Sequence, residues 1–291
     1  MSADGNALAG RTALITGAGR GLGLEIARTY LREGARVALC ARTEAGMRGA
    51  FAQLHALGEV HARVADVAVP AQVDALVGWA VKRLGGLDVL VNNAGVWGPK
   101  GRIEDVAWEE WAAAIQTNLM GSVLCARAAL PHLRRSERGK VVQLSGGGAT
   151  SPMPMLSAYA ASKAAVVRFA ETLAGEVLAD GIDVNAVAPG ALNTRMLDEL
   201  LDAGPEAVGE DTYAKALAQR DGGGASLERA AELAAYFGSR ASDGISGRLV
   251  SAVWDPWEEL GERAGDLAGT DIYTLRRIIP SERGHGWGER T

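Results

Sequence analysis

The sequence predicts an α/β fold, a doubly wound parallel sheet of about seven strands with helices on both faces, in a single domain. Short apolar runs alternate with longer stretches of helical periodicity along the chain, and this order builds parallel sheets. Several of the runs are almost wholly apolar, as strands buried on both faces are. No Pro-, Ser- or Gly-rich linker divides the 291 residues, so one domain accounts for the length.

The elements follow in chain order. Strands are expected at 12–16, 36–40, 60–64, 87–91, 140–144, 182–187 and 248–253. Helices are expected between them at 22–32, 44–57, 71–84, 108–134, 156–179 and 227–238. Ligands bind outside the carboxyl ends of the strands in such sheets, so the residues directly after each strand are the ones to examine for chemistry.

Composition excludes several classes of protein. The chain is 48% hydrophobic with a net charge of −5 and a pI near 5.5, which disfavours a nucleic-acid surface. Two cysteines, Cys40 and Cys125, exclude a disulfide scaffold and indicate a reducing compartment. The absence of a signal peptide and of a long apolar run predicts a cytoplasmic protein with no membrane partner. No metal is expected, because four histidines show no ligand spacing: His55, His61, His132 and His285.

A glycine-rich turn follows the first strand and opens the next helix. Gly17, Gly19, Gly21 and Gly23 let the backbone turn sharply and approach a ligand closely. The free N–H groups and the positive dipole end of the following helix would stabilise a pyrophosphate there. The strand–turn–helix context supports a dinucleotide site.

Six motifs resemble the short-chain dehydrogenase/reductase family, over about residues 8–253. They are T-G-x-x-x-G-x-G at 16–23, "VADV" with Asp66, "NNAG" at 92–95, "TNLMG" with Asn118, "YAASK" at 159–163 and "APGALNT" at 188–194. The resemblance implies a Rossmann-type fold, oxidoreductase activity on a small-molecule carbonyl or alcohol, and a homodimer or homotetramer.

The family pattern also implies which residues contact the cofactor. Asp66 would hold the adenine ring, "NNAG" would form a structural and cofactor-contacting turn, and Thr194 would bind the nicotinamide carboxamide. With the arginines argued in the next paragraph, the predicted cofactor-binding set is Gly17, Gly19, Arg20, Gly21, Leu22, Gly23, Arg42, Asp66, Val67, Asn93, Ala94, Gly95, Tyr159, Lys163, Pro189, Gly190 and Thr194.

The residues after the second strand favour NADP(H) over NAD(H). A carboxylate at this point would accept the ribose hydroxyls, but the sequence has Ala41 followed by Arg42. A guanidinium binds a 2′-phosphate through charge-assisted hydrogen bonds, and Arg20 could add a second positive charge. NAD(H) stays open as an alternative, with Arg42 solvated and both cofactors accepted.

Tyr159 and Lys163 lie one turn apart on one face of the predicted helix. A lysine ammonium about 4 Å away stabilises a phenolate by about 4 kcal/mol at an effective dielectric of 20, equal to roughly three pK units. The sequence therefore predicts Tyr159 as general acid/base, with its pKa brought toward neutrality. The resemblance adds Asn118, which would anchor a water that connects Lys163 to solvent.

Ser145 is the predicted polarising residue, donating a hydrogen bond to the substrate carbonyl oxygen. It stands fourteen positions before Tyr159, whereas relatives most often place a serine thirteen positions before the tyrosine, where this chain has Gly146. Our hypothesis is that the glycine run absorbs one extra residue and brings Ser145 into place. The alternative is polarisation by the backbone N–H groups of Gly146 and Gly147.

Two further regions are expected to shape the substrate site. Residues 191–224 fit a substrate lid with "DGGG" as its hinge, or else a variable surface insertion. Residues 254–291 form a C-terminal extension that packs on the domain or on a neighbouring subunit, or that brings Arg276 or Arg277 to a substrate anion. The candidate pocket residues, which suggest a partly apolar substrate, are Met153, Met155, Leu192, Met196 and Tyr213.

The sequence thus predicts an NADP-preferring oxidoreductase that interconverts a ketone and a secondary alcohol by hydride transfer. Two alternatives stay open. One is an epimerase or dehydratase that retains the cofactor, and the other is a non-catalytic dinucleotide-binding protein of the same fold.

Overall fold

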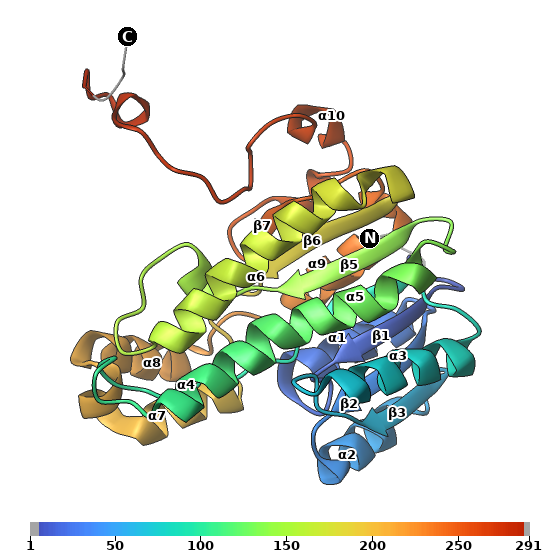
Figure 1. Cartoon of the computed structure of the whole chain (residues 1–291), viewed down its shortest axis with the longest axis horizontal. Coiled ribbons are helices and arrows are strands. Elements are labelled where there is room, and N and C mark those ends of the chain that lie inside the picture. The colour runs from blue at the N-terminus through green and yellow to red at the C-terminus, as the bar shows by residue number, and fades with distance from the viewer. Residues whose placement is uncertain (1–5, 288–291) are drawn as a thin grey trace.

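The seven strands form one parallel sheet, which confirms the predicted fold class (Figure 1). The structure is a computed structural model that describes residues 6–287. The strand order is β3-β2-β1-β4-β5-β6-β7. The bounds are β1 Thr12–Thr16, β2 Arg36–Ala41, β3 Val60–Val64, β4 Val89–Asn92, β5 Gly139–Leu144, β6 Ile182–Ala188 and β7 Leu249–Ser251.

The order in which strands are added to the sheet changes direction after β3, so that β1 and β4 are neighbours. The first three strands are added outward on one side, and β4 then pairs with the other edge of β1, Ala13 opposite Val89. The loops that follow β1 and β4 therefore diverge to opposite faces and leave a crevice between them. This crevice is where the sheet topology alone places a ligand.

Helices cover both faces of the sheet. On one face lie α1 (Gly21–Arg32), α2 (Glu44–Leu54) and α9 (Leu227–Gly238), and on the other lie α3 (Pro70–Leu84), α5 (Gly121–Leu133) and α6 (Ser157–Glu176). Within β1, Ile15 belongs to the first core and Leu14 to the second, because successive side chains of a strand point to opposite faces. Figure 1 shows α3, α5 and α6 in front of the sheet, with α1 and α9 behind it.

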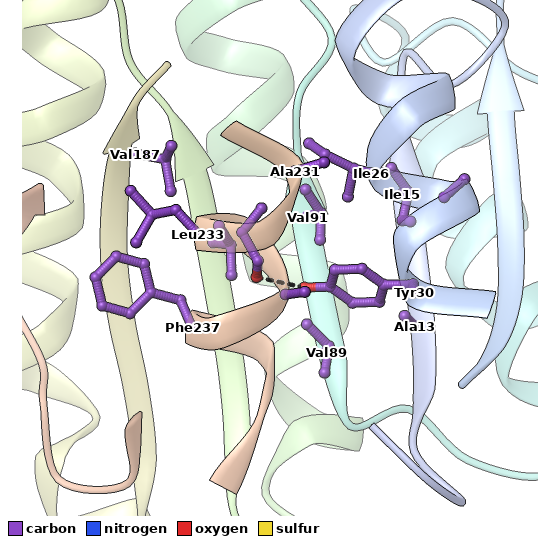
Figure 2. Close-up of a cluster of buried hydrophobic side chains, with 14 of the residues drawn as sticks. Ala13, Ile15, Ile26, Tyr30, Val89, Val91, Val187, Ala231, Leu233 and Phe237 are labelled. Atoms are coloured by element: carbon purple, nitrogen blue, oxygen red, sulfur yellow. Dashed lines mark hydrogen bonds between the residues drawn. The ribbon is translucent and has the colours of Figure 1, made fainter. Parts of the chain in front are cut away.

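Tyr30 joins α1 to α9 at the centre of the first core (Figure 2). Its ring is fully buried beside Val89 and Val91, and its hydroxyl donates a 2.8 Å hydrogen bond to the carbonyl of Ala234. A buried phenol that finds a partner can stay in the core without leaving an unsatisfied polar group. This contact helps to hold the helix pair that supports β1 and β4 from behind.

The predicted helix 108–134 is divided into three parts. α4 (Trp108–Ile115) and α5 are joined by η1 (Gln116–Met120), a π-helical turn with Asn118 at its centre. Such turns insert a residue into an α-helix and often mark functional sites. The backbone of Val96 binds both the oxygen and the nitrogen of the Asn118 amide, and this tertiary contact accompanies the wider turn.

The segment 191–224 is helical and lies beyond the carboxyl ends of the strands (Figure 1). It contains α7 (Arg195–Val208), which is kinked at Gly204 (φ 76°), and α8 (Glu210–Gly222). The "DGGG" end of α8 is held in place: Gly223 and Gly224 have positive φ, and Ala225 N–H donates to the carbonyl of Ala191 at 2.8 Å. The base of the helical pair is thus bonded to the loop after β6.

The C-terminal extension packs on its own domain as far as Leu275. Trp257, Leu260 and Leu267 are buried in the same core as α1 and α9. The Arg248 guanidinium donates to the carbonyls of Leu267, Thr270 and Ile272. Beyond Leu275 the chain leads away from the body (Figure 1). The short elements of this region are η5 (Trp257–Glu259), α10 (Ala264–Leu267) and η6 (Pro280–Arg283).

Three more short helices complete the described chain: η2 (Gly147–Ala149), η3 (Leu178–Asp180) and η4 (Arg240–Ser242). Within residues 6–287, no helix has the length and apolar character needed to cross a membrane.

Candidate active site

A cavity of about 1460 Å³ lies at the carboxyl ends of the strands, between the sheet and the α7–α8 pair. Every predicted site residue lines it except Asp66 and Asn118. Segments that are far apart in sequence meet here, from Gly17 after β1 to Thr194 before α7. The crevice that the strand order creates is therefore the place where the predicted residues gather.

The glycine turn and the "NNAG" turn are bonded to each other. The Asn93 side-chain amide donates to the carbonyls of Thr16 (2.9 Å) and Gly17 (3.2 Å). The Thr16 hydroxyl oxygen accepts from the N–H groups of Asn93 (3.0 Å) and Ala94 (3.1 Å). Sequence reasoning did not assign Thr16 a site role, although its place as the first residue of the T-G-x-x-x-G-x-G motif was a signal.

Gly17 shows why this contact requires glycine. Its φ is 65°, and a Cβ there would lie 2.7 Å from the Cα of Ala94. A larger residue would be strained by the backbone angle and would also collide with the neighbouring turn. The two loops can approach each other only with a glycine at this position.

The residues at this end of the cavity fit a dinucleotide. Arg20 precedes α1 in an extended conformation without capping it, and the first turn of α1 has no acidic residue. The first amides of this helix are therefore free of a side-chain cap and suited to a pyrophosphate. Arg20 and Arg42 are exposed on the cavity wall, and neither makes an ion pair with any residue between 6 and 287.

Asp66 does not line the cavity, although its neighbours Ala65 and Val67 do. Its carboxylate accepts a 2.9 Å hydrogen bond from the N–H of Ala68, and its own N–H donates to the Gln72 side chain. These bonds order the turn between β3 and α3. Contact of Asp66 with the adenine ring stays a prediction.

Tyr159 and Lys163 lie in the first two turns of α6 and face the cavity together. Their exposed fractions are 8% and 6%. The Lys163 ammonium nitrogen is 5.7 Å from the centroid of the Tyr159 ring and donates a 2.7 Å hydrogen bond to the Leu144 carbonyl at the end of β5. The spacing of these residues on the helix thus places an ammonium and a phenol at the same wall.

Burial dominates the ionisation of this pair. It raises the pKa of Tyr159 to about 12 and lowers the pKa of Lys163 to about 8, because desolvation penalises the charged form of each group. The expected fall of the tyrosine pKa toward neutrality is therefore not produced by this arrangement of side chains. A further positive charge is needed beside the phenol to reverse the direction.

Asn118 is 1% exposed and lies outside the lining of the cavity, behind residues that form its wall. Its amide oxygen accepts from Val96 N–H at 2.8 Å, while its amide nitrogen donates to the Ser162 hydroxyl, also at 2.8 Å. Ser162 in turn donates to the Tyr159 carbonyl at 2.7 Å. A Cβ on Gly95 would lie 3.4 Å from the Asn118 oxygen and 3.5 Å from the Lys163 nitrogen, so both side chains lie close to this glycine.

Ser145 lies at the cavity wall, and its side chain is largely buried. The residue is 3% exposed, and its oxygen has no hydrogen-bond partner among the described residues. Its N–H donates to the Val187 carbonyl at 2.8 Å, which extends the pairing of β5 with β6. Because Ser145 lines the cavity and its hydroxyl has no partner among the described residues, its polarising role stays a prediction.

The cavity wall beside Tyr159 includes one aromatic residue that sequence reasoning missed. The Trp97 ring packs on the Tyr159 ring in a tilted arrangement, with centroids 4.2 Å apart. Its indole N–H donates to the Met196 carbonyl in α7 at 2.7 Å. Its position two residues after the "NNAG" turn was the signal. Four of the five predicted pocket residues line the cavity, while Tyr213 packs in the cluster between α7 and α8.

The fold and the site define the class of this protein. A sequence profile described as short chain dehydrogenase matches residues 11–204. The chain belongs to this family of oxidoreductases, which confirms the family resemblance of its motifs.

Particular relatives are similar over most of their length. 3beta-Hydroxysteroid dehydrogenase 1 of Eggerthella lenta is 40% identical over 205 residues, which cover 69% of this chain and 77% of the relative. Levodione reductase has a TM-score of 0.77 at 28% identity, covering 88% of this chain and 98% of its own. A single-substitution variant of actinorhodin polyketide ketoreductase, solved with NADPH, has a TM-score of 0.75 at 32% identity, covering 83% and 95%.

Proposed function

We propose that this protein interconverts a ketone and a secondary alcohol with NADP(H), using Tyr159 as the general acid/base. The observation that carries the proposal is the buried Tyr159–Lys163 pair at the wall of a 1460 Å³ cavity whose other end is the glycine turn. The match to the short chain dehydrogenase family supports it.

The chemistry divides between the cofactor and the chain. A bound nicotinamide cofactor would supply the hydride in reduction and accept it in oxidation. In reduction the carbonyl carbon gains this hydride, and the carbonyl oxygen gains the proton of the Tyr159 hydroxyl. The ketone thus gains two electrons and two hydrogens in total, and the products are the alcohol, NADP⁺ and a phenolate at Tyr159.

The neighbouring residues stabilise the phenolate that forms at Tyr159. The Lys163 ammonium, 5.7 Å from the Tyr159 ring, favours the ionised phenol electrostatically. The positive charge of an oxidised nicotinamide bound here would act in the same direction and oppose the effect of burial on the Tyr159 pKa. Asn118 holds the Val96 backbone and Ser162, and through them it orders the wall on which Tyr159 and Lys163 lie.

The cofactor preference is proposed from Arg42 and Arg20. Both guanidinium groups are exposed on the cavity wall, and Ala41 stands where a carboxylate would repel a 2′-phosphate. We expect Arg42→Ala to lower kcat/KM for NADPH roughly tenfold while that for NADH changes little, since only NADPH carries the phosphate. A wild-type kcat/KM for NADH at or above that for NADPH would contradict the preference.

The substrate is proposed to be a largely apolar ketone. Trp97, Met153 and Met196 line the end of the cavity beyond Tyr159. Flexible methionines and an aromatic face suit a hydrophobic or cyclic ligand. The names of the relatives, a hydroxysteroid dehydrogenase and a polyketide ketoreductase, agree with such a substrate.

Replacing Tyr159 tests the function. With NADPH and a panel of cyclic and aromatic ketones, we expect wild-type protein to oxidise the cofactor stoichiometrically with alcohol formation. Tyr159→Phe should lower kcat by roughly 10²–10⁴, the contribution of a general acid, while the Kd for NADPH stays within about threefold. Tyr213→Phe, in a half-buried tyrosine outside the cavity lining, is the matched control.

Three outcomes would redirect the assignment. NADPH binding without turnover of any ketone would favour the non-catalytic alternative. Product formation without net NADPH consumption would favour the epimerase or dehydratase. A Tyr159→Phe variant as active as the control would remove Tyr159 from the chemistry.

The quaternary structure and the cytoplasmic location stay predictions. We expect a homodimer or homotetramer, which light scattering coupled to size-exclusion chromatography measures directly. A monomer at micromolar concentration would contradict this expectation.

A further inference from the structure

A tight turn just before α6 holds a methionine in a backbone conformation that favours glycine. Within residues 6–287, the two residues other than glycine that have a positive φ are Met155 (φ 68°) and Tyr273 (φ 60°). A side chain in this conformation crowds its own backbone, so the conformation persists only where the surrounding structure holds it. Tyr273 lies in the C-terminal extension, whereas Met155 lines the cavity.

The local sequence explains why Met155 is held in this way. The Leu156 N–H donates to the Met153 carbonyl at 3.1 Å and closes a four-residue turn. Pro154 has the second position of this turn, where its ring fixes a negative φ. Met155 has the third position, and its positive φ makes the turn type II, in which this position favours glycine. The turn therefore has a backbone suited to glycine and carries a large apolar side chain instead.

Hydrogen bonds fix the backbone on both sides of the Met155 side chain. The Met155 carbonyl accepts a 2.9 Å hydrogen bond from the N–H of Gly101. The next residue, Leu156, is fully buried, and its carbonyl accepts from the N–H of Ala160 at 3.0 Å in α6. Rotation of the turn to relieve the strain would break these contacts. The side chain of Met155 is therefore directed by its neighbours and not by its own backbone preference.

The Met155 side chain reaches the helices that cover the cavity. Its Cγ lies 3.8 Å from the position that a Cβ on Gly209 would take. Gly209, with φ 84°, is the single residue between the end of α7 and the start of α8. Both residues line the cavity, and Met155 stands four positions before Tyr159. The thioether thus lies between the turn that precedes the helix of Tyr159 and the α7–α8 junction.

We propose that Met155 is a specificity-determining residue that limits the length of the apolar substituent on the ketone. This inference rests on the proposed function. The thioether occupies cavity volume between the turn and Gly209, and a longer substituent would need that volume. Glycine at position 155 would leave this volume open and would also remove the backbone strain. A strained residue that lines a binding cavity is a candidate for function, because strain of this kind gathers at ligand sites.

The first experiment measures the chain length that the site accepts. The probes are phenyl alkyl ketones from acetophenone to hexanophenone, which differ only in their alkyl chain, and each is reduced with NADPH by wild type, Met155→Ala and Met155→Gly. We expect both variants to raise kcat/KM for hexanophenone at least tenfold, the lower end of the discrimination that a hydrophobic pocket makes per methylene, and to change that for acetophenone by less than about threefold. The same dependence on chain length in all three proteins would overturn the proposal.

The second experiment tests the strain without any substrate. At an ordinary position glycine is less stable than alanine, but at a positive φ the order reverses. We expect the Tm of Met155→Gly to exceed that of Met155→Ala by about 2–4 °C. Met153, in the same turn and without a positive φ, is the matched control, and there the alanine variant should be the more stable. A Met155→Gly protein no more stable than Met155→Ala would overturn the strained placement.

A binding measurement separates this inference from the proposed function. A ketone and NADP⁺ cannot react, because both are oxidised, so calorimetric titration in the presence of NADP⁺ gives the Kd of each phenone without turnover. We expect Met155→Gly to bind hexanophenone at least tenfold more tightly than wild type does, with acetophenone unchanged. If no ketone is reduced but this difference is found, the proposed function fails and the length limit stands. Equal Kd values, or no binding of any phenone to any of the proteins, would overturn the length limit.

Discussion

At the scale of single residues, Lys163 is held in the folded protein at a cost in stability. Its side chain is 6% exposed and has one hydrogen bond, to the Leu144 carbonyl, and burial lowers its pKa to about 8. Below pH 8 the lysine is charged in both the folded and the unfolded state, so folding bears the full desolvation penalty. Between pH 8 and 10.5 only the unfolded state keeps the proton, and stability rises with pH.

Lys163→Met should therefore stabilise the cofactor-free protein while it abolishes activity. We expect a higher Tm at pH 7, with a gain in unfolding free energy on the order of 1–3 kcal/mol that shrinks between pH 8 and 10.5. Chemical denaturation at a series of pH values measures it. A destabilised variant at pH 7, or a gain independent of pH, would contradict this prediction.

Lys140 provides the opposite case and the control for that experiment. It is fully buried, but it pairs with Asp183 at 2.8 Å and with Asp243 at 2.7 Å. Lys140→Met would leave Asp183, which is 1% exposed, with only Arg138 as a cationic partner among the described residues. We expect it to lose about 3–5 kcal/mol of unfolding free energy, the usual result of breaking a buried pair.

At the scale of elements, Trp97 joins α7 to the cavity wall that carries Tyr159. The indole N–H binds the Met196 carbonyl in the first turn of α7, while the ring packs on Tyr159 in α6. Asn118 binds Val96, the residue before Trp97, from the π-helical turn below. One short segment therefore connects the helix over the cavity to the helix that carries Tyr159.

Trp97→Phe should loosen α7 without removing the aromatic contact to Tyr159. The Met196 carbonyl would lose its partner, at a cost of about 1–3 kcal/mol. We expect the KM for the ketone to rise roughly tenfold with a smaller change in kcat, as steady-state kinetics would show. Trp108→Phe makes the same change on a tryptophan that is 66% exposed, and an equal effect of the two substitutions would contradict the link.

At the scale of the whole molecule, the C-terminal extension completes the core behind β1 and β4. Trp257 and Leu260 are 2% exposed, and Trp257 packs on the Tyr236 ring of α9. Burying side chains of this size contributes about 1.5–3 kcal/mol each, and whole domains are stable by only about 5–15 kcal/mol. The extension up to Leu275 is therefore part of the folding unit.

Two truncations should separate the parts of this extension. Deleting residues 256–291 removes Trp257, Leu260 and Leu267 from the core, and we expect insoluble or thermally unstable protein. Deleting residues 276–291 should leave Tm and KM within error of wild type, because Arg276 pairs locally with Asp271 and Arg277 does not line the cavity. A raised KM in the shorter deletion would instead support contact of these arginines with a substrate.

Local patterns determined much of this protein. Residues 12–16 are largely apolar and form β1 as predicted, and the glycine run after them opens α1. Tyr159 and Lys163 share a face because helical spacing places residues four apart side by side. These features depend on chain periodicity and on steric limits that act over a few residues, which is why the sequence alone predicts them.

The tertiary structure decided what depends on contacts between distant segments. The π-helical turn at Asn118 accompanies its bonds to Val96, twenty-two residues away. The raised pKa of Tyr159 comes from burial by several elements at once. A Cβ on Gly146 would lie 2.3 Å from the Tyr159 hydroxyl oxygen, whereas one on Gly147 would meet nothing within 4 Å. This distinction is invisible in the run "SGGG", because only the packed position of Tyr159 fills the space beside one of the two glycines. Such features depend on contacts between segments that are far apart in the sequence. A local sequence pattern does not determine how closely those segments pack.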